Sequence, residues 1–282
     1  MATLAALGSA LCIGAADFTG GWASRKQSPL LITLWINVVA LVAVAIACVL
    51  GGPRISESRA IAALVGGCVS GAAINLIYAS FAAGAMSLTA PLVACGTAIL
   101  PTLTATVAGQ PPDAVQGVGI VFALAGVIAI TWRPPARSAH VSLSRRALVL
   151  TALASVGAGA AISILLLAAK GGSAVALGVS GLSRLTTFGT CLLFVLVTRT
   201  PARLPRALAP PVLGAGLLEV SGVTLFLLAS SLGSTAVVAV LVSLNAIITV
   251  MLAQTVLREQ IASHQRGGIA FAAIGVALLS AG

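Results

Sequence analysis

The chain has 282 residues, of which 59% are hydrophobic and only 7% are charged. A soluble globular chain carries about 25% charged residues, so this composition excludes a soluble globular fold. The formal net charge of +10 would suit a nucleic-acid partner. However, the Lys and Arg residues stand in short segments between apolar blocks, where membrane proteins use them to fix topology. No nucleic-acid partner is therefore expected.

Apolar blocks of about 20 residues, the length that a helix needs to cross the hydrocarbon layer, recur along the chain. The alternating pattern of a transmembrane β-barrel strand is not visible. Gly, Pro and charged residues separate ten predicted helices. They span residues 3–24, 30–51, 60–83, 87–108, 114–132, 147–169, 174–198, 211–231, 234–257 and 267–281. The sequence thus predicts an all-α polytopic membrane protein.

The first predicted helix contains Asp17, an ionisable residue within a membrane span. Such residues are costly to insert and are functional-site hypotheses by default. One interpretation is that Asp17 reaches the membrane interface, or pairs with Arg25 or Lys26. The other is that Asp17 is a protonatable group that couples transport to a proton gradient.

Polar and aromatic residues on the second and third predicted helices are candidate lining residues of a cavity. Trp35 and Asn37 lie on the second helix, and Asn75 and Tyr78 on the third. Asn75 and Tyr78 are three residues apart and so share one helix face. An aromatic ring beside an amide would accept a flat or apolar side chain. The alternative is interhelical hydrogen bonding, which is common in membranes.

The seventh and eighth predicted helices each contain one charged residue near mid-span, Arg184 and Glu219. Consecutive helices run antiparallel, so the two side chains reach similar depths and can pair. The functional alternative is substrate recognition: Arg suits a carboxylate through its planar donors, and Glu suits an ammonium group. Together they would suit a zwitterion. Asn245 on the ninth helix is a further candidate substrate-binding residue.

The tenth predicted helix repeats the fifth. QGVGIVFALAGVIAI at Gln116 and QRGGIAFAAIGVALL at Gln265 are 149 residues apart and share seven of fifteen positions. This predicts two homologous units, residues 1–138 and 139–282. Because five crossings is an odd number, the units enter the membrane from opposite sides, as in many secondary transporters with a midplane site.

The positive charges predict the orientation. Loops after the odd-numbered helices hold eleven Lys and Arg residues, whereas the other loops hold only Arg54, Arg59 and Lys170. The first set is expected in the cytoplasm. Both termini are therefore predicted on the periplasmic side.

The ten-helix plan, the two halves and the closing Q-x-x-G…A-x-x-G-V helix resemble the EamA-type branch of the drug/metabolite transporter (DMT) superfamily, including amino-acid exporters of the YddG type. Members of that family often have the sequence Leu-Gly-Glu at the end of the fourth helix of each half. Here the second half has Leu257-Arg258-Glu259, and the first has Ala108-Gly109-Gln110. The resemblance implies a carrier of small metabolites in the bacterial inner membrane that works by alternating access.

The expected function is export of amino acids, with neutral or aromatic ones favoured, or of similar small metabolites. The alternative is export of drugs, sugar phosphates or nucleotide sugars. The sequence shows no HExxH, GxSxG or Walker motif, so neither an enzyme nor a cofactor or metal site is expected. A GxxxG surface, Gly67 to Gly71, suits packing within the bundle or a homodimer; a monomer is also compatible.

Overall fold

A computed structural model describes residues 2–53, 55–107, 112–131, 143–169, 173–232, 244–259 and 261–281. Within these residues the regular structure is entirely α-helical. The helices are α1 (Ala2–Ser24), α2 (Pro29–Gly51), α3 (Glu57–Ala83), α4 (Met86–Val107), α5 (Ala114–Thr131), α6 (Arg145–Ala169), α7 (Ser173–Val197), α8 (Ala209–Leu232), α10 (Asn245–Val256) and α11 (Ser263–Ala281).

These ten helices match the ten predicted spans, and most ends agree within three residues. The exceptions are α11, which begins four residues earlier than predicted, and the ninth span, of which α10 is the described helix; residues 233–243 lie outside the described part. In the described part, α1, α2, α3, α6 and α7 are long and apolar enough to cross a membrane, and four shorter apolar helices accompany them. The protein is thus an all-α polytopic membrane protein, as the sequence predicts.

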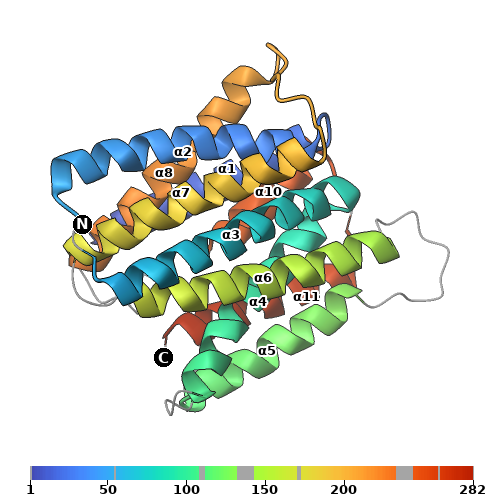
Figure 1. The fold of residues 1–282 in the computed structure, drawn as a ribbon. Helices are drawn as coiled ribbons and strands as arrows, with labels where there is room; N and C mark the ends of the chain where they lie inside the picture. The colour runs from blue at the N-terminus through green and yellow to red at the C-terminus, as the bar shows by residue number, and fades with distance from the viewer. Residues whose placement is uncertain are drawn as a thin grey trace.

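The helices lie lengthwise beside one another and alternate in direction, so the bundle has two ends (Figure 1). We call the end at which α1 ends the Arg25 face and the end at which α2 ends the Gly51 face. The start of α1 and the end of α11 both lie at the Gly51 face (Figure 1). The predicted boundary at residue 138, and Arg54 and Lys170 of the orientation argument, lie outside the described residues.

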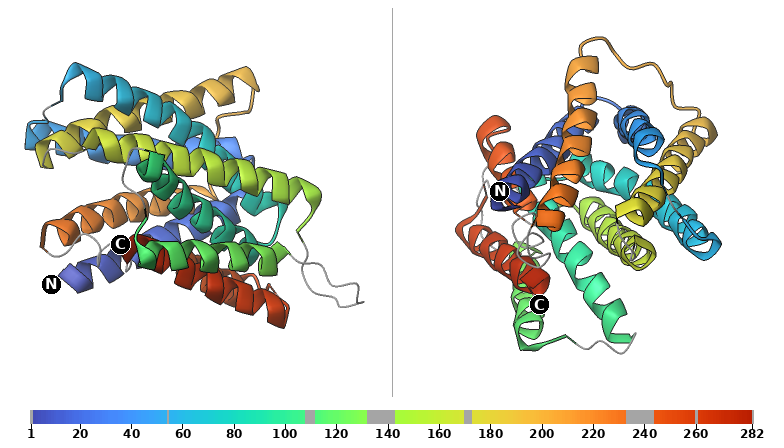
Figure 2. Two further views of the ribbon diagram at one scale, coloured as in Figure 1. Left: turned by 90° about the horizontal axis from the view of Figure 1, so that it is seen from below. Right: turned by 90° about the vertical axis from the view of Figure 1, so that its left-hand side faces the viewer.

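Most helix pairs join the first five helices to the last five. The contacts follow the internal repeat. Helix α1 contacts α8, and their counterparts in the other half, α6 and α3, also contact each other. Likewise α4 contacts α6, and their counterparts α10 and α1 contact each other. The pairs α2–α7, α4–α10 and α5–α11 map onto themselves, and they are present too. Helices α5 and α11 lie side by side in both views of Figure 2.

The two copies of the repeated helix pack on each other through glycines. A Cβ atom at Gly126 would meet backbone atoms of Ala272 and Gly268, and one at Gly119 would meet those of Leu279 and Gly275. The repeat places Gly119 opposite Gly268 and Gly126 opposite Gly275 in the sequence alignment. Each contact is therefore the counterpart of the other. Small residues at these positions let the two backbones approach closely.

The buried aromatic side chains Phe18, Tyr78 and Phe81 belong to one cluster toward the Arg25 face. We call this group the Arg25-face cluster; it comprises Phe18, Ala23, Ile32, Ile36, Tyr78, Phe81, Met86, Ala90, Leu208, Val212, Ala215 and Ala253. These residues come from the ends of α1, α3 and α10, the beginnings of α2, α4 and α8, and the segment before α8. The cluster packs both halves together at this end of the bundle.

Candidate functional site

A cavity of about 400 Å³ lies between α2, α3, α6, α7 and α8. We call it the ion-pair cavity because both Arg184 and Glu219 line it. Its wall continues along α6 to Ala169 and along α7 to Ala176, which lie near the ends of those helices. The cavity therefore extends from the middle of the bundle toward the Gly51 face.

Arg184 and Glu219 form an ion pair, with 2.6 Å between Nη1 and Oε1. The sequence-based expectation that two mid-span charges on consecutive helices can pair is confirmed. The pair also faces the cavity, since the side chains are 20% and 25% exposed. Pairing and cavity lining therefore occur together. Each group keeps hydrogen-bonding capacity beyond its partner, because guanidinium has five N–H donors and a carboxylate accepts about four hydrogen bonds.

Further polar groups surround the pair in the same cavity. Asn37 of α2 is buried; its amide donates to the carbonyl of Thr33 (2.9 Å), and its Oδ1 accepts no hydrogen bond from the described residues. The oxygen itself is covered by its neighbours and is not open to the cavity. On α7 a polar stripe faces the cavity beside Arg184, formed by Ser180, Ser183 and Thr187.

The polar stripe of α7 was not predicted from the sequence, although the sequence contains a signal for it. Positions 180, 183, 184 and 187 follow the i, i+3, i+4, i+7 spacing of a single helix face. The hydroxyl groups of Ser183 and Thr187 donate hydrogen bonds to the carbonyl groups of Ser180 and Gly67, respectively. Their oxygen lone pairs remain available as acceptors.

A second cavity of about 270 Å³ adjoins the first, and we call it the Asp17 cavity. Asp17 of α1 and Asn245 of α10 line it. The two cavities have a common wall, made of Ser70, Ile74, Ile162 and Leu165. Candidate residues from both halves of the chain therefore line two adjoining cavities.

Asp17 does not pair with Arg25 or Lys26, so the pairing part of the first interpretation of this residue is wrong. Arg25 bonds to Glu259 instead, at 2.6 Å, and the Lys26 ammonium lies over the ring of Trp22, 3.8 Å from its centre. Asp17 makes no hydrogen bond or ion pair with any described residue. Its carboxyl group lies within electrostatic reach of Glu219.

The other candidates lie outside the described walls of both cavities. The amide of Asn75 donates to the carbonyl of Gly71 (2.7 Å) and to Sγ of Cys191 (3.4 Å), which holds α3 against α7. The indole N–H of Trp35 donates to the carbonyl of Ala202 (2.9 Å), in the segment before α8. Trp35 thus lies near the Arg25 face, away from the ion pair.

Tyr78 is buried in the Arg25-face cluster, and its ring lies against Gly20 of α1. A Cβ atom at Gly20 would overlap that ring, so the glycine is needed for this packing. Phe81 packs beside it at 6.2 Å between ring centroids. Tyr78 therefore serves the packing of α3 against α1 in this structure.

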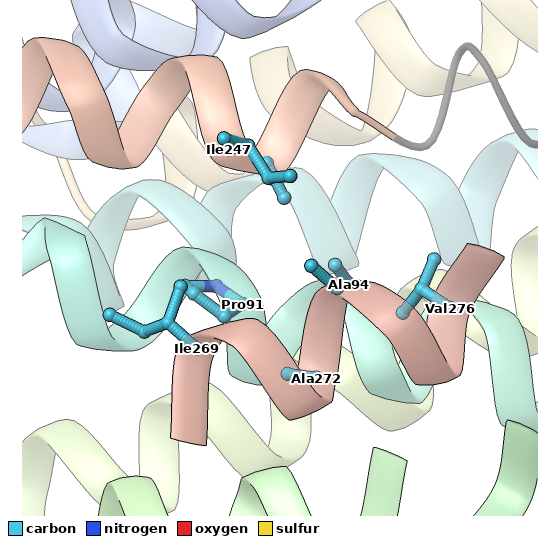
Figure 3. A pocket seen from close by; sticks show the side chains of 8 residues that line it. Pro91, Ala94, Ile247, Ile269, Ala272 and Val276 are labelled. Carbon is cyan, nitrogen blue, oxygen red and sulfur yellow. The ribbon is translucent and has the colours of Figure 1, made fainter. Parts of the chain in front are cut away.

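A small recess between α4, α10 and α11 is shown in Figure 3. Pro91, Ala94, Ile247, Ile269, Ala272 and Val276 point toward it (Figure 3). It has about 10 Å³ of space, which is room for about one water molecule. With apolar walls and this size, the recess is not a cargo site.

Sequence reasoning also missed a polar junction at the Arg25 face. Glu259, which follows α10, bonds to Arg25 and accepts hydrogen bonds from the start of α4. The sequence signal was the partial Leu-Gly-Glu motif, but nothing in the sequence indicated the partners of its carboxylate.

Comparison with known proteins supports a transporter fold. Residues 1–132 match the model of the EamA-like transporter family. Among solved structures, one described as "Crystal structure of protein" has a TM-score of 0.63 over 98% of this chain and 95% of the other. At 14% sequence identity, this similarity establishes the fold alone. No curated protein matches the chain.

Proposed function

We propose that this chain is a secondary transporter of the drug/metabolite transporter superfamily that moves amino acids or similar small zwitterions by alternating access. The observation that carries the proposal is the Arg184–Glu219 ion pair, which lines a cavity of about 400 Å³ within a membrane bundle. The EamA-like match of residues 1–132 supports the transporter class.

A zwitterion is the cargo whose charges complement this pair. Its carboxylate would bind the planar donors of Arg184, with the hydroxyl groups of the α7 stripe beside it. Its ammonium group would donate to Glu219, which lines the same cavity. Cargo binding exchanges one ion pair for two, so neither buried charge is left without a partner.

The remaining wall favours a neutral side chain. Ile74, Ile162, Leu165, Val179 and Val223 line the same cavity and offer an apolar surface. Pockets for small molecules usually have about 300–1,000 Å³ of space with few polar groups. Phosphorylated cargo is less well matched, because Arg184 is the one cation on the described cavity walls and is already paired.

Asp17 is the coupling group in this proposal. Its carboxyl group lines the adjoining cavity without a hydrogen-bond donor or cation as partner among the described residues. Its charge also repels that of Glu219. A proton on Asp17 would lower that repulsion, so protonation and cargo binding are linked through Glu219. This arrangement suits an antiporter driven by a proton gradient.

The architecture we propose is two inverted repeats, residues 1–138 and 139–282. The counterpart helix pairs and the reciprocal glycine contacts of α5 and α11 support it. We further propose that the protein lies in the bacterial inner membrane with the Arg25 face toward the cytoplasm. The positive residues Arg25, Lys26, Arg199 and Arg203 near that face support this orientation.

The test is exchange in liposomes preloaded with a panel of labelled amino acids, with and without a pH gradient. We expect exchange of neutral or aromatic amino acids, reduced about 100-fold or more in Arg184→Gln and Glu219→Gln, as buried charge pairs contribute several kcal/mol to binding. Arg145→Gln is the matched control, since Arg145 is an exposed cation at the start of α6. Asp17→Asn should retain exchange and lose its dependence on the pH gradient.

Tyr78→Phe, which keeps the ring that packs on Gly20, tests the role of the Tyr78 hydroxyl group without creating a cavity. Absence of amino-acid exchange in folded protein would contradict the proposed cargo. Uptake of organic cations or sugar phosphates by the same liposomes would then identify the alternative. Full exchange activity in Arg184→Gln would show that the ion pair does not bind cargo.

A further inference from the structure

Glu259 lies at a junction of four segments at the Arg25 face. Its Oε1 accepts from the backbone N–H of Met86 (3.1 Å), and its Oε2 accepts from the N–H (2.9 Å) and hydroxyl (2.6 Å) of Ser87. These are first-turn donors of α4, which have no partner within the helix. A carboxylate is favoured there by the helix dipole as well.

Arg25 joins the same junction from the end of α1. Its Nη2 donates to Glu259 Oε1 (2.6 Å) and to the carbonyl of Gly84 (2.8 Å), and its Nε donates to the carbonyl of Phe81 (3.1 Å). Arg25 therefore also satisfies carbonyl groups at the end of α3. The Glu259 side chain is only 8% exposed, so water competes little for its bonds.

This junction joins the two halves of the chain directly above the Arg25-face cluster. Glu259 belongs to the second half, whereas its partners on α1 and α4 belong to the first. The cavities lie on the other side of the cluster, and the ion-pair cavity extends toward the Gly51 face. Among the described residues, the Arg25 face is thus closed by the cluster and the junction, and the ion-pair cavity extends toward the opposite face.

The positions that the internal repeat aligns with Arg25 and Glu259 hold different residues. The internal alignment pairs Arg25 with Lys170 and Glu259 with Gln110, both outside the described residues. The aligned positions hold a cation but no carboxylate. The internal alignment therefore does not repeat the Arg25–Glu259 pair.

We infer that the Arg25–Glu259 ion pair is a latch that holds the Arg25 face closed, so that the resting carrier favours access from the Gly51 face. This inference rests on the alternating-access function proposed above. For cargo to reach the Arg25 face, α1 and α4 must separate from the segment after α10. That movement breaks the ion pair, and the charged hydrogen bonds lost set the bias between the two states.

The latch is tested by cysteine reactivity with a charged maleimide in detergent, which requires no cargo and no transport. The five native cysteines are first replaced by Ala. Ala215→Cys then reports on the Arg25-face cluster, where this side chain is 1% exposed. Ala176→Cys reports on the cavity wall near the Gly51 face. Failure of the transport assay leaves this readout unaffected.

Breaking the latch should raise the labelling rate of Ala215→Cys about tenfold and lower that of Ala176→Cys. Arg25→Gln and Glu259→Gln should each have this effect. Arg25→Gln removes the ion pair but leaves Glu259 in place to cap α4. This variant therefore distinguishes loss of the ion pair from loss of the helix cap. The double variant should match the single variants, because both remove the same interaction.

Three results would overturn the latch. The first is an unchanged rate at Ala215→Cys in variants that elute as folded protein in gel filtration. The second is a rise at both reporter positions, which signals loosening of the whole bundle. The third is additive effects in the double variant, which signal two independent contacts.

Discussion

At the scale of single residues, Arg258 has a backbone conformation that suits glycine. Its φ of 54° lies in the left-handed region, where a residue with a Cβ atom is strained by roughly 1–2 kcal/mol. The family that the sequence resembles often has Leu-Gly-Glu where this chain has Leu257-Arg258-Glu259. The turn at Arg258 directs the next residue, Glu259, back to α4 and α1. The left-handed conformation therefore belongs to the geometry of the junction.

We predict that Arg258→Gly stabilises the protein by about 1 kcal/mol, because glycine adopts a positive φ without strain. The measurement is the midpoint of thermal unfolding in detergent. Arg203→Gly is the matched control: it removes a cation at the same face, but its φ is not positive. An equal or larger gain in Arg203→Gly would show that charge, not backbone strain, explains the result.

At the scale of helices, the backbones of α5 and α11 approach each other closely at their glycines. Gly126 faces the backbone of Ala272, and Gly275 faces the backbone of Ala123. Between helices in lipid the hydrophobic effect contributes little, so close backbone contact supplies much of the association. This explains why the repeated sequence retains its glycines while many of its large residues differ.

We predict that Gly126→Ala lowers the free energy of unfolding by roughly 1–3 kcal/mol, since its Cβ would meet backbone atoms that cannot yield. The matched control is Gly117→Ala on the same helix, where a Cβ would meet nothing within 4 Å. Gly117→Ala should be neutral or slightly stabilising. Equal unfolding midpoints for the two variants would contradict the close packing of α5 on α11.

At the scale of the whole molecule, each half depends on the other for its packing. Helix α1 packs mainly on α8, and α3 packs on α6 and α7. Neighbours within the first half, such as α1 and α2, have far less contact. A half expressed alone would expose faces rich in small and polar residues to lipid.

We predict that residues 1–138 and 139–282, expressed from separate genes, co-purify as one complex, and that neither half alone elutes as a folded monomer. Gel filtration in detergent of each half, and of the tagged pair, is the measurement. A second half carrying Gly268→Leu is the control, because Gly268 lies against Ala129 and Ile130 of α5. A first half that is stable alone would show that the interface between the halves is not needed for folding.

Much of the fold follows from the sequence because lipid leaves the backbone few choices. Every N–H and C=O group must be bonded within its own segment, so apolar blocks of sufficient length predict helices with ends close to the observed ones. The lengths of α1, α2 and α7 show this directly. Charged residues within such blocks are rare, so Asp17, Arg184 and Glu219 stood out as candidates before any contact was known.

The contact partners of such residues are harder to predict from the sequence than the residues themselves. Arg184 and Glu219 lie on consecutive helices, so their pairing could be anticipated from depth alone. Arg25 and Glu259 are 234 positions apart, and no sequence pattern joins them. Asp17 lies near Arg25 in the chain, yet Arg25 pairs with Glu259 and Asp17 lines the Asp17 cavity.

The sequence by itself determined the membrane class and the helices, and it predicted a duplication and the polar residues worth testing. Only the tertiary structure decided which of those residues line a cavity, which serve packing and where the bundle is closed. The physical reason is that helix formation in lipid is a local requirement of the backbone. The rotation of one helix against another depends instead on small residues and hydrogen bonds contributed by distant parts of the chain.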